Sequence, residues 1–273
     1  GHADYAGTIK YAQDDVRNIL ERASARETAA RVSVGAVCKK LLKEFDIKIF
    51  SHVVQIGKIR VSREITGGSL AVWHQISKRA ERSELRCADK SAESRMKDLI
   101  DKMRQKGDSL GGVFEVVVLG APVGLGSYVQ WDKRLSTRLA AAVMSIPAIK
   151  GVDIGLGFGS AAMSGSRVHD ELFIKGGKFY RNTNNAGGLE GGMTNGEPIV
   201  LKGAMKPIAT LKKPLMTVDL KTKRSAEAHV ERADTCAVPA AGVVAESMVA
   251  YEIARAFLEK YGGDSMAEIR KRL

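Results

Sequence analysis

The chain has 273 residues, 44% of them hydrophobic and only 5% aromatic, and its 43 Lys and Arg against 31 Asp and Glu give a net charge of +12. This length is ample for a buried core, and no run of 18 or more apolar residues could span a membrane. The cysteines Cys38, Cys87 and Cys236 are widely spaced without a CxxC pair, which argues against structural zinc or a disulfide framework. We therefore expect a soluble, cytoplasmic protein with no bound metal.

The positive charge implies anionic partners. Nucleic acid is one candidate, but no basic run is interleaved with the aromatic side chains on which bases stack. The basic residues are instead spread along the chain, some of them beside Gly, Ser and Thr. This pattern favours small phosphorylated ligands, with solvated helix faces as the alternative, and we expect no nucleic-acid partner.

Strands and helices are mixed along the chain without a regular βαβ alternation, which predicts an α+β fold. Hydrophobic periodicity and the positions of Gly and Pro predict these elements in chain order: one broken or two helices over 10–45, a strand over 47–61 interrupted at Gly57, a turn at Gly67-Gly68 within the polar stretch 62–90, a helix over 92–106, a strand over 112–119, a turn over 122–126, a helix over 132–144, strands 172–174 and 178–181 around Gly176-Gly177, and a helix from Pro239 to Tyr261. The small residues at helical spacing between Thr28 and Leu42 imply close packing against a neighbouring element. Because no repeat or clear linker divides the chain, we expect a single domain over residues 1–273.

The stretch from Arg181 to Gly196 is rich in Gly and Asn, so it predicts neither a core helix nor a regular strand. Gly permits positive φ, and Asn tolerates left-handed conformations. Lys206 and Thr210 follow, a cation and a hydroxyl four residues apart. A backbone-lined turn followed by such a pair would suit a phosphorylated, planar ligand, and a long surface loop is the alternative.

Two pairs of ionisable residues could carry proton chemistry. His2 lies two residues from Asp4, and histidine is the usual proton donor or acceptor at neutral pH, although a terminal histidine is often idle. Arg232 and Asp234 fall on the same side of an extended segment just before the last helix. Arg232 could clamp an anion while Asp234 moves a proton; capping of the helix is the alternative role for Asp234.

A third cluster could bind an anion. Arg22 and Arg26 lie one helical turn apart with Ser24 between them, and arginine offers planar, bidentate donors to phosphate or carboxylate. An N-capped helix with ion pairs would use the same residues.

Taken together, nine segments of the chain resemble the chorismate synthase family. They occur in the expected order from residue 1 to about residue 265 and read GHADYAGTIKY, ERASARETAAR, SHVVQIG, GAPVGLGS, MSIPAIKGV, TNNAGGLEGGMTNGEPI, KPIATL, ERADTCAVPAA and LEKYGGDS. One such segment would be a weak signal, whereas nine in order are highly specific.

The resemblance implies an α+β sandwich of antiparallel sheets and helices that assembles as a homotetramer. It also implies a carbon–oxygen lyase of the shikimate pathway, which eliminates phosphate from 5-enolpyruvylshikimate-3-phosphate to give chorismate for aromatic amino-acid biosynthesis. The family needs reduced FMN, which donates electron density transiently without net redox change. Whether the protein reduces its flavin itself with NADPH or relies on an external source stays open. A non-catalytic protein that binds anions or nucleic acid on the same scaffold is the alternative function.

Site residues are implied by the same resemblance. His2 matches the histidine proposed to protonate reduced FMN, and Asp234 the carboxylate proposed to remove the substrate proton. Ser24, Arg26 and Arg232 match residues that line the flavin and the anionic substrate. The other matched FMN contacts are Arg22, Ala23, Pro147, Ala148, Gly191, Lys206, Pro207, Ile208, Ala209 and Thr210, of which Lys206 and Thr210 are the natural phosphate ligands.

One departure from the family concerns the beginning of the chain. The family has a segment, with a Thr-Ala-Gly-Glu-Ser-His-Gly motif and further arginines, ahead of the position where this chain starts. The second catalytic histidine and part of the substrate-phosphate site belong to that segment. We therefore expect residues 1–273 to be a catalytic core that is N-terminally truncated relative to the family, and to be weakly active or inactive.

Overall fold

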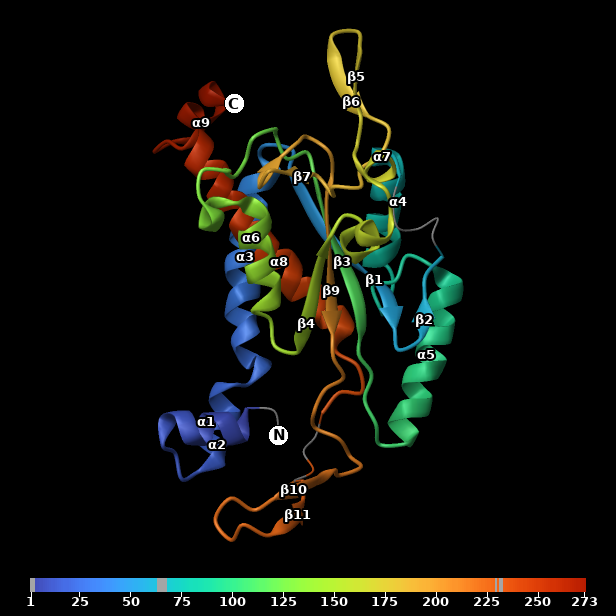
Figure 1. Ribbon diagram of the computed structural model, residues 1–273, viewed down its shortest axis with the longest axis vertical. Coiled ribbons are helices and arrows are strands. Elements are labelled where there is room, and N and C mark those ends of the chain that lie inside the picture. Colours follow the sequence, from blue (N-terminus) through green and yellow to red (C-terminus); the bar gives the residue numbers. More distant parts are fainter. Residues whose placement is uncertain (1–2, 63–67, 229, 231–232) are drawn as a thin grey trace.

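An antiparallel sheet of five strands forms the centre of the molecule (Figure 1). The computed structural model describes residues 3–62, 68–228, 230 and 233–273. In spatial order the strands are β2 (Ile59–Arg60), β1 (Lys48–Ile56), β3 (Gly112–Leu119), β9 (Ile199–Met205) and β4 (Ile149–Ile154). The predicted strands over 47–61 and 112–119 are confirmed, and Gly57 makes the turn between β1 and β2 with a φ of 52°.

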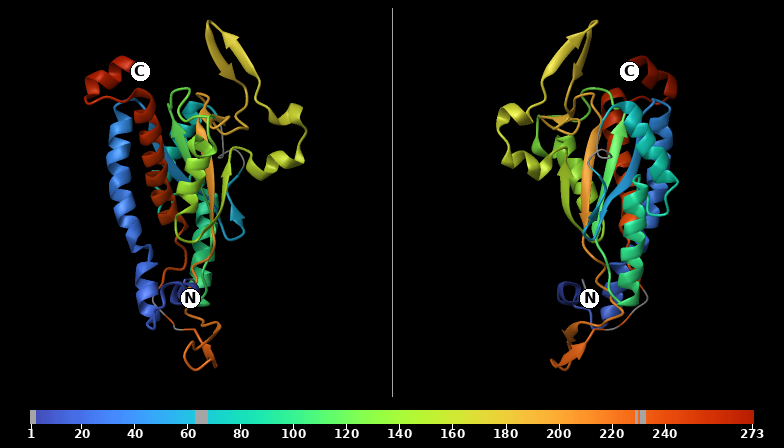
Figure 2. Two further views of the ribbon diagram at one scale, coloured as in Figure 1. Left: turned by 60° about the vertical axis from the view of Figure 1, so that its left-hand side comes forward. Right: turned by 90° about the vertical axis from the view of Figure 1, so that its right-hand side faces the viewer.

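Helices cover both faces of this sheet, as alternate residues of β1 demonstrate. Ser51 points toward α8 (Val238–Tyr261), where its hydroxyl donates to Glu246. The ring of Phe50 points the other way and lies 6.3 Å from that of Trp73 in α4 (Leu70–Glu81). Successive side chains of a strand point to opposite faces, so α8 and α4 lie on opposite sides. Figure 2 shows α8 and α3 (Thr28–Lys43) side by side on the α8 side.

Strand β3 is apolar along most of its length because both of its faces are buried. Phe114, Val116 and Val118 join the large core beneath α8, whereas Val117 and Leu119 join a smaller core with Trp73. Each buried side chain of this size stabilises the fold by about 1.5–3 kcal/mol. The two covered faces explain the continuous apolar pattern of this strand, which is more usual for parallel sheets.

The small residues of α3 allow it to pack closely against α8, as the sequence predicted. A Cβ added at Gly35 would lie only 2.2 Å from the Cβ of Ser247 in α8. Glu246 of α8 pairs with Lys39 of α3 at 2.6 Å and with Arg86 at 2.6 Å, and it accepts a hydrogen bond from Ser51 of β1 at 2.7 Å. Close approach and charge pairing together fix the position of α3.

Several predicted elements are confirmed with small shifts, and others were missed. The predicted helix over 132–144 begins as a short 3-10 turn and becomes α6 (Leu135–Met144), and the helix over 92–106 is α5 (Lys90–Gln105). The polar stretch 62–90 contains the unpredicted helix α4, since only a narrow stripe of it is buried. Strand β9 was also missed because Lys202 and Gly203 interrupt its apolar pattern.

The remaining elements are short and lie mostly at the ends of the sheet. They are α1 (Asp4–Tyr11), α2 (Val16–Arg22), η1 (Ala25–Glu27), η3 (Trp131–Lys133), η4 (Gly157–Ala162), α7 (Gly165–Val168), β5 (Leu172–Lys175), β6 (Lys178–Arg181), β7 (Leu189–Glu190), β8 (Met193–Thr194), β10 (Met216–Val218), β11 (Ser225–Glu227) and α9 (Met266–Arg272). The predicted hairpin around Gly176-Gly177 is confirmed as β5–β6, and this hairpin and the β10–β11 arm project from opposite ends of the molecule (Figure 1). Within the described part of the chain, no helix is long and apolar enough to cross a membrane.

Candidate functional site

Two of the predicted site segments meet at the end of β9. The backbone N–H of Lys206 donates to the carbonyl of Ala148 at 2.9 Å, so the Lys206–Thr210 segment runs beside the turn that contains Pro147. Ala148 adopts a left-handed conformation with a φ of 67°, which is uncommon for a residue with a Cβ. Since strain of this kind concentrates at functional sites, this turn is a candidate ligand contact.

The start of α3 approaches the same turn. The guanidinium of Arg31 donates to the hydroxyl of Ser145 at 2.7 Å and to Glu27 at 2.9 Å. These bonds fasten the beginning of α3 to the residues just before Pro147. The predicted cluster of Arg22, Ala23, Ser24 and Arg26 immediately precedes α3 and is thereby kept at the same end of the sheet.

Within that cluster, the local contacts match the alternative of a capped, ion-paired turn. The Ser24 hydroxyl accepts a hydrogen bond from the N–H of Arg26 at 3.3 Å and caps η1. The guanidinium of Arg26 pairs with Glu21 in an exposed contact. Exposed pairs of this kind contribute at most about 1 kcal/mol, so Arg26 can exchange its partner for a bound anion at little cost.

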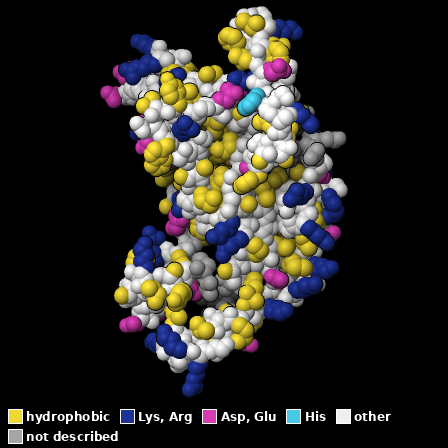
Figure 3. All heavy atoms as spheres, viewed as in Figure 1, with side chains coloured by type: hydrophobic (Ala, Val, Ile, Leu, Met, Phe, Trp, Pro, Cys, Tyr) yellow, Lys and Arg dark blue, Asp and Glu magenta, His cyan; other side chains and the backbone are white. Residues whose placement is uncertain are grey.

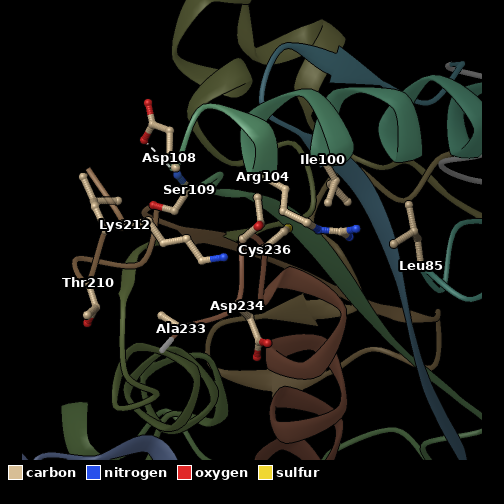
Figure 4. Close-up of a pocket in the computed structure, with 13 residues that line it drawn as sticks. Leu85, Ile100, Arg104, Asp108, Ser109, Thr210, Lys212, Ala233, Asp234 and Cys236 are labelled. Atoms are coloured by element: carbon tan, nitrogen blue, oxygen red, sulfur yellow. Dashed lines mark hydrogen bonds between the residues drawn. The ribbon is translucent and has the colours of Figure 1, made fainter. Parts of the chain in front are cut away.

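A cavity of about 340 Å³ contains Asp234 (Figure 4). Its lining residues are Leu85, Ile100, Arg104, Gly107, Asp108, Ser109, Thr210, Leu211, Lys212, Ala233, Asp234, Thr235 and Cys236. Asp234 does not cap α8, because the residue at the N-cap is Ala237 and no side chain bonds the first turn. The capping alternative is therefore wrong, and among the described residues no hydrogen bond or ion pair engages this carboxylate.

The cations of this cavity come from two separate segments. Arg104 lies on α5 and pairs with Asp101 at 3.1 Å, whereas Lys212 lies on the loop that follows Thr210. In the part of the chain that the structure describes, no ion pair or side-chain hydrogen bond engages Lys212 or Lys206. Burial raises the pKa of the Cys236 thiol, so this wall of the cavity stays uncharged at neutral pH.

A second, larger cavity of about 990 Å³ adjoins the first between the N-terminal helices and the β10–β11 arm. Its walls include the predicted residues Pro207, Ile208, Ala209 and Thr210. They also include Tyr5 and Arg17 of the N-terminal helices, which sequence reasoning did not single out. The two cavities share four lining residues, Asp108, Ser109, Thr210 and Leu211. Figure 3 shows the hollow above the β10–β11 arm, with Lys and Arg side chains around it.

Within one chain, Gly191 lies apart from the other predicted site residues. It lies in the turn between β7 and β8, and its neighbour Gly192 accepts a hydrogen bond from Leu135 at the start of α6. Pro147 lies beyond the opposite end of this ten-residue helix, which spans about 15 Å. Two predicted residues, His2 and Arg232, lie outside the described residues.

These contacts define the class of protein: an α+β fold in which two adjoining cavities, the carboxylate of Asp234 and two lysines, Lys206 and Lys212, lie at one end of the sheet, the lysines without an ion pair among the described residues. Residues 1–258 match the model of the family described as chorismate synthase. The chain is 58% identical to the chorismate synthase of Syntrophotalea carbinolica over 273 residues, and this alignment covers 100% of the chain and 69% of the relative. It is 57% identical to that of Desulforamulus reducens, with 100% and 70% covered.

A solved crystal structure of chorismate synthase shares the fold, with a TM-score of 0.84 and 50% identity over 99% of this chain and 74% of that chain. The chain belongs to the chorismate synthase family. Its function is the carbon–oxygen lyase reaction that forms chorismate in the shikimate pathway, with a flavin cofactor and a small-molecule substrate. The predicted α+β class with antiparallel sheets is confirmed, and the binding-protein alternative is not favoured.

Proposed function

We propose that the chain binds reduced FMN in the larger cavity and 5-enolpyruvylshikimate-3-phosphate beside it, with Asp234 acting on the substrate. The single observation that carries the proposal is the shared wall: Thr210 of the predicted FMN segment lines both cavities, and Asp234 lines the smaller one. A flavin and a substrate on either side of this segment would lie in direct contact.

The residues present fit a phosphorylated flavin. Lys206 has no competing partner among the described residues, and Thr210 supplies a hydroxyl four residues later. A cation with a hydroxyl gives the charge-assisted hydrogen bonds that a phosphate prefers. Pro207, Ile208 and Ala209, which lie between them, add apolar side chains to the wall of the larger cavity, and these suit an aromatic ring. Arg22, Ala23, Ser24 and the Pro147–Ala148 turn complete the proposed cofactor contacts.

The proposed chemistry separates proton removal from phosphate departure. When bound, reduced FMN supplies electron density that eases loss of the allylic phosphate. Asp234 receives the substrate proton as the C–H bond breaks, because its carboxylate lines the smaller cavity and is engaged by no described residue, whereas that of Asp108 accepts a hydrogen bond from Ser109. Ser24, Arg26 and Arg232 hold the anionic groups of the substrate, and fixed cations stabilise the charge that develops on the departing phosphate.

The proposed proton donor to the flavin is His2. Its support comes from its sequence neighbours, because Asp4 and Tyr5 line the larger cavity. A histidine two residues before this wall can exchange a proton near neutral pH.

We further propose a homotetramer of single catalytic cores, each spanning residues 1–273, in the cytoplasm. The position of Gly191 supports assembly, since this residue is about one helix length away from the other proposed contacts of its own chain. A second copy would bring its Gly191 to the site. A reducing compartment is supported by the three cysteines, which are all free.

Flavin titration tests the cofactor site. Lys206→Ala and Thr210→Ala should each raise the FMN dissociation constant about tenfold, since each removes a charge-assisted hydrogen bond. Lys175→Ala, on the exposed β5–β6 hairpin, is the matched control and should bind FMN like the parent chain. Equal affinity for all three variants and the parent would contradict the proposed phosphate site.

A further inference from the structure

The turn between α5 and β3 joins the two segments of the site. Ser109 donates its hydroxyl hydrogen to the carbonyl of Ile208 at 2.7 Å. The N–H of Leu110 donates to the carbonyl of Thr235 at 2.7 Å, beside Asp234. One turn therefore bonds the proposed cofactor segment on one side and the segment of the proposed base on the other.

Further contacts fix the distance between this turn and the cofactor segment. The N–H of Lys213 donates to the carbonyl of Gly107 at 3.1 Å, and Gly107 has a φ of 69°, which favours glycine. A Cβ added at Gly111 would lie 2.3 Å from the carbonyl oxygen of Met205. The backbone of the turn, residues 107–111, thus approaches the backbone of residues 205–213 as closely as glycine permits.

Ser109 is the one side chain of the turn that bonds the cofactor segment within the described part of the chain. The residue is only 8% exposed, and it lines both cavities. Its own N–H bonds the carboxylate of Asp108 at 2.8 Å, which holds the residue in place. Without the hydroxyl, the carbonyl of Ile208 would lose a partner that water can replace only by entering the cavities.

We propose that Ser109 is a positioning residue, whose hydroxyl holds the Pro207–Thr210 segment in register with Asp234. This inference rests on the proposed function of that segment. In this role the hydroxyl contacts neither the flavin nor the substrate. It fixes the carbonyl of Ile208, so that Lys206 and Thr210 keep one position relative to Asp234. Catalysis depends on such placement, because small displacements of a positioned group lower the rate.

The first test uses the chain without ligand. In hydrogen–deuterium exchange, Ser109→Ala should speed exchange of the Lys206 and Lys213 amides about fivefold, since one neutral hydrogen bond is lost. Ser247→Ala is the matched control: Ser247 is also buried and donates to a carbonyl, that of Val243 in α8. Unchanged exchange in Ser109→Ala, or the same increase in Ser247→Ala, would overturn the proposal.

The second test measures ligand binding and rate. Ser109→Ala should raise the FMN dissociation constant about tenfold and lower kcat more than it changes KM. Ser109→Thr keeps the hydroxyl, so its FMN dissociation constant and kcat should be those of the parent chain. Parent-like affinity and kcat in Ser109→Ala would overturn the proposal. Failure of the parent chain to bind FMN would instead contradict the proposed cofactor site, and the exchange experiment would still decide the role of Ser109.

Discussion

The protein uses ionic groups in two opposite ways in two regions. Beneath α8, the carboxylate of Glu246 is 6% exposed and is bonded by Lys39, Arg86 and Ser51. At the end of β9, Lys206 and Lys212 have no partner in the described part of the chain. Charges of the first kind are satisfied within the fold, so they specify packing. Charges of the second kind have no ion pair among the described residues, and these are the lysines that we propose to contact a ligand.

The largest expected effect comes from Asp234, the proposed base of the site. Asp234→Asn should slow chorismate formation about 10²–10⁴-fold, the usual contribution of a proton-transferring group, while the free energy of unfolding changes by less than about 0.5 kcal/mol. Single-turnover experiments with the chain in excess over substrate would measure the rate. Asp132→Asn, an exposed carboxylate on η3, is the control and should leave the rate unchanged. A large loss of stability in Asp234→Asn would show that this carboxylate stabilises the fold, as Glu246 does, and would contradict the comparison between the two regions.

Substitution of the paired carboxylate Glu246 beneath α8 should instead change the stability of the fold. Glu246→Gln should lower the free energy of unfolding by about 2–4 kcal/mol, because Lys39 loses its carboxylate partner and Arg86 keeps only the exposed Glu81. Denaturant titration would measure this change. Glu84→Gln removes a carboxylate that is 83% exposed and should cost less than about 1 kcal/mol. If both variants were equally stable, Glu246 would not anchor the helices.

Close packing of α3 and α8 should show a smaller effect. Gly35→Ala places a Cβ within 2.2 Å of Ser247, and the overpacking should cost about 1–3 kcal/mol, partly offset by the better helix propensity of Ala. Gly159→Ala is the control, because a Cβ there meets nothing within 4 Å. Thermal unfolding would separate the two variants, and equal melting temperatures would contradict the close approach.

The smallest effect concerns Asp170, which organises the Asn- and Gly-rich loop. Partial burial alone would raise its pKa, but hydrogen bonds from the N–H of Ala186, the hydroxyl of Thr183 and the N–H of Asn185 lower it below the usual 3.8. Because the folded pKa is depressed, this stabilisation is complete above the unfolded pKa near 3.9 and is lost as the pH falls through the lower folded value.

An NMR pH titration would measure this transition. The amide shifts of Asn185 and Ala186 should titrate with a midpoint below 3.8 and should stay constant above about pH 5. Asp170→Asn should abolish the transition. A midpoint above pH 4 would contradict the bonding of this carboxylate.

Elements whose burial follows a simple period were predictable from the sequence. The strand over 112–119 and the helix that became α8 have continuous apolar patterns because they lie at the centre of the core. Helix α4 was missed because its buried stripe is narrow, and α9 because it is short and mostly exposed. Strand β9 was missed because a lysine points from its middle toward the buried Glu115.

The candidate site was only partly accessible to sequence reasoning. The residue pattern and the resemblance both singled out Lys206 and Asp234, but no pattern connects them to Ser109, which bonds Ile208 across 99 positions of the chain. Such a bond is set by how the strands pair and where the turn before β3 lies. For the same reason the sequence did not reveal that Gly191 lies at the other end of α6 from Pro147.

The most direct test of the shared site is an FMN titration, followed by flavin absorbance and fluorescence, with and without 5-enolpyruvylshikimate-3-phosphate. If the two ligands occupy adjoining cavities that share Thr210, substrate should tighten FMN binding, and Lys206→Ala should weaken it with or without substrate. FMN affinity that is identical with and without substrate, and unchanged in Lys206→Ala, would contradict a site shared by flavin and substrate at the end of β9.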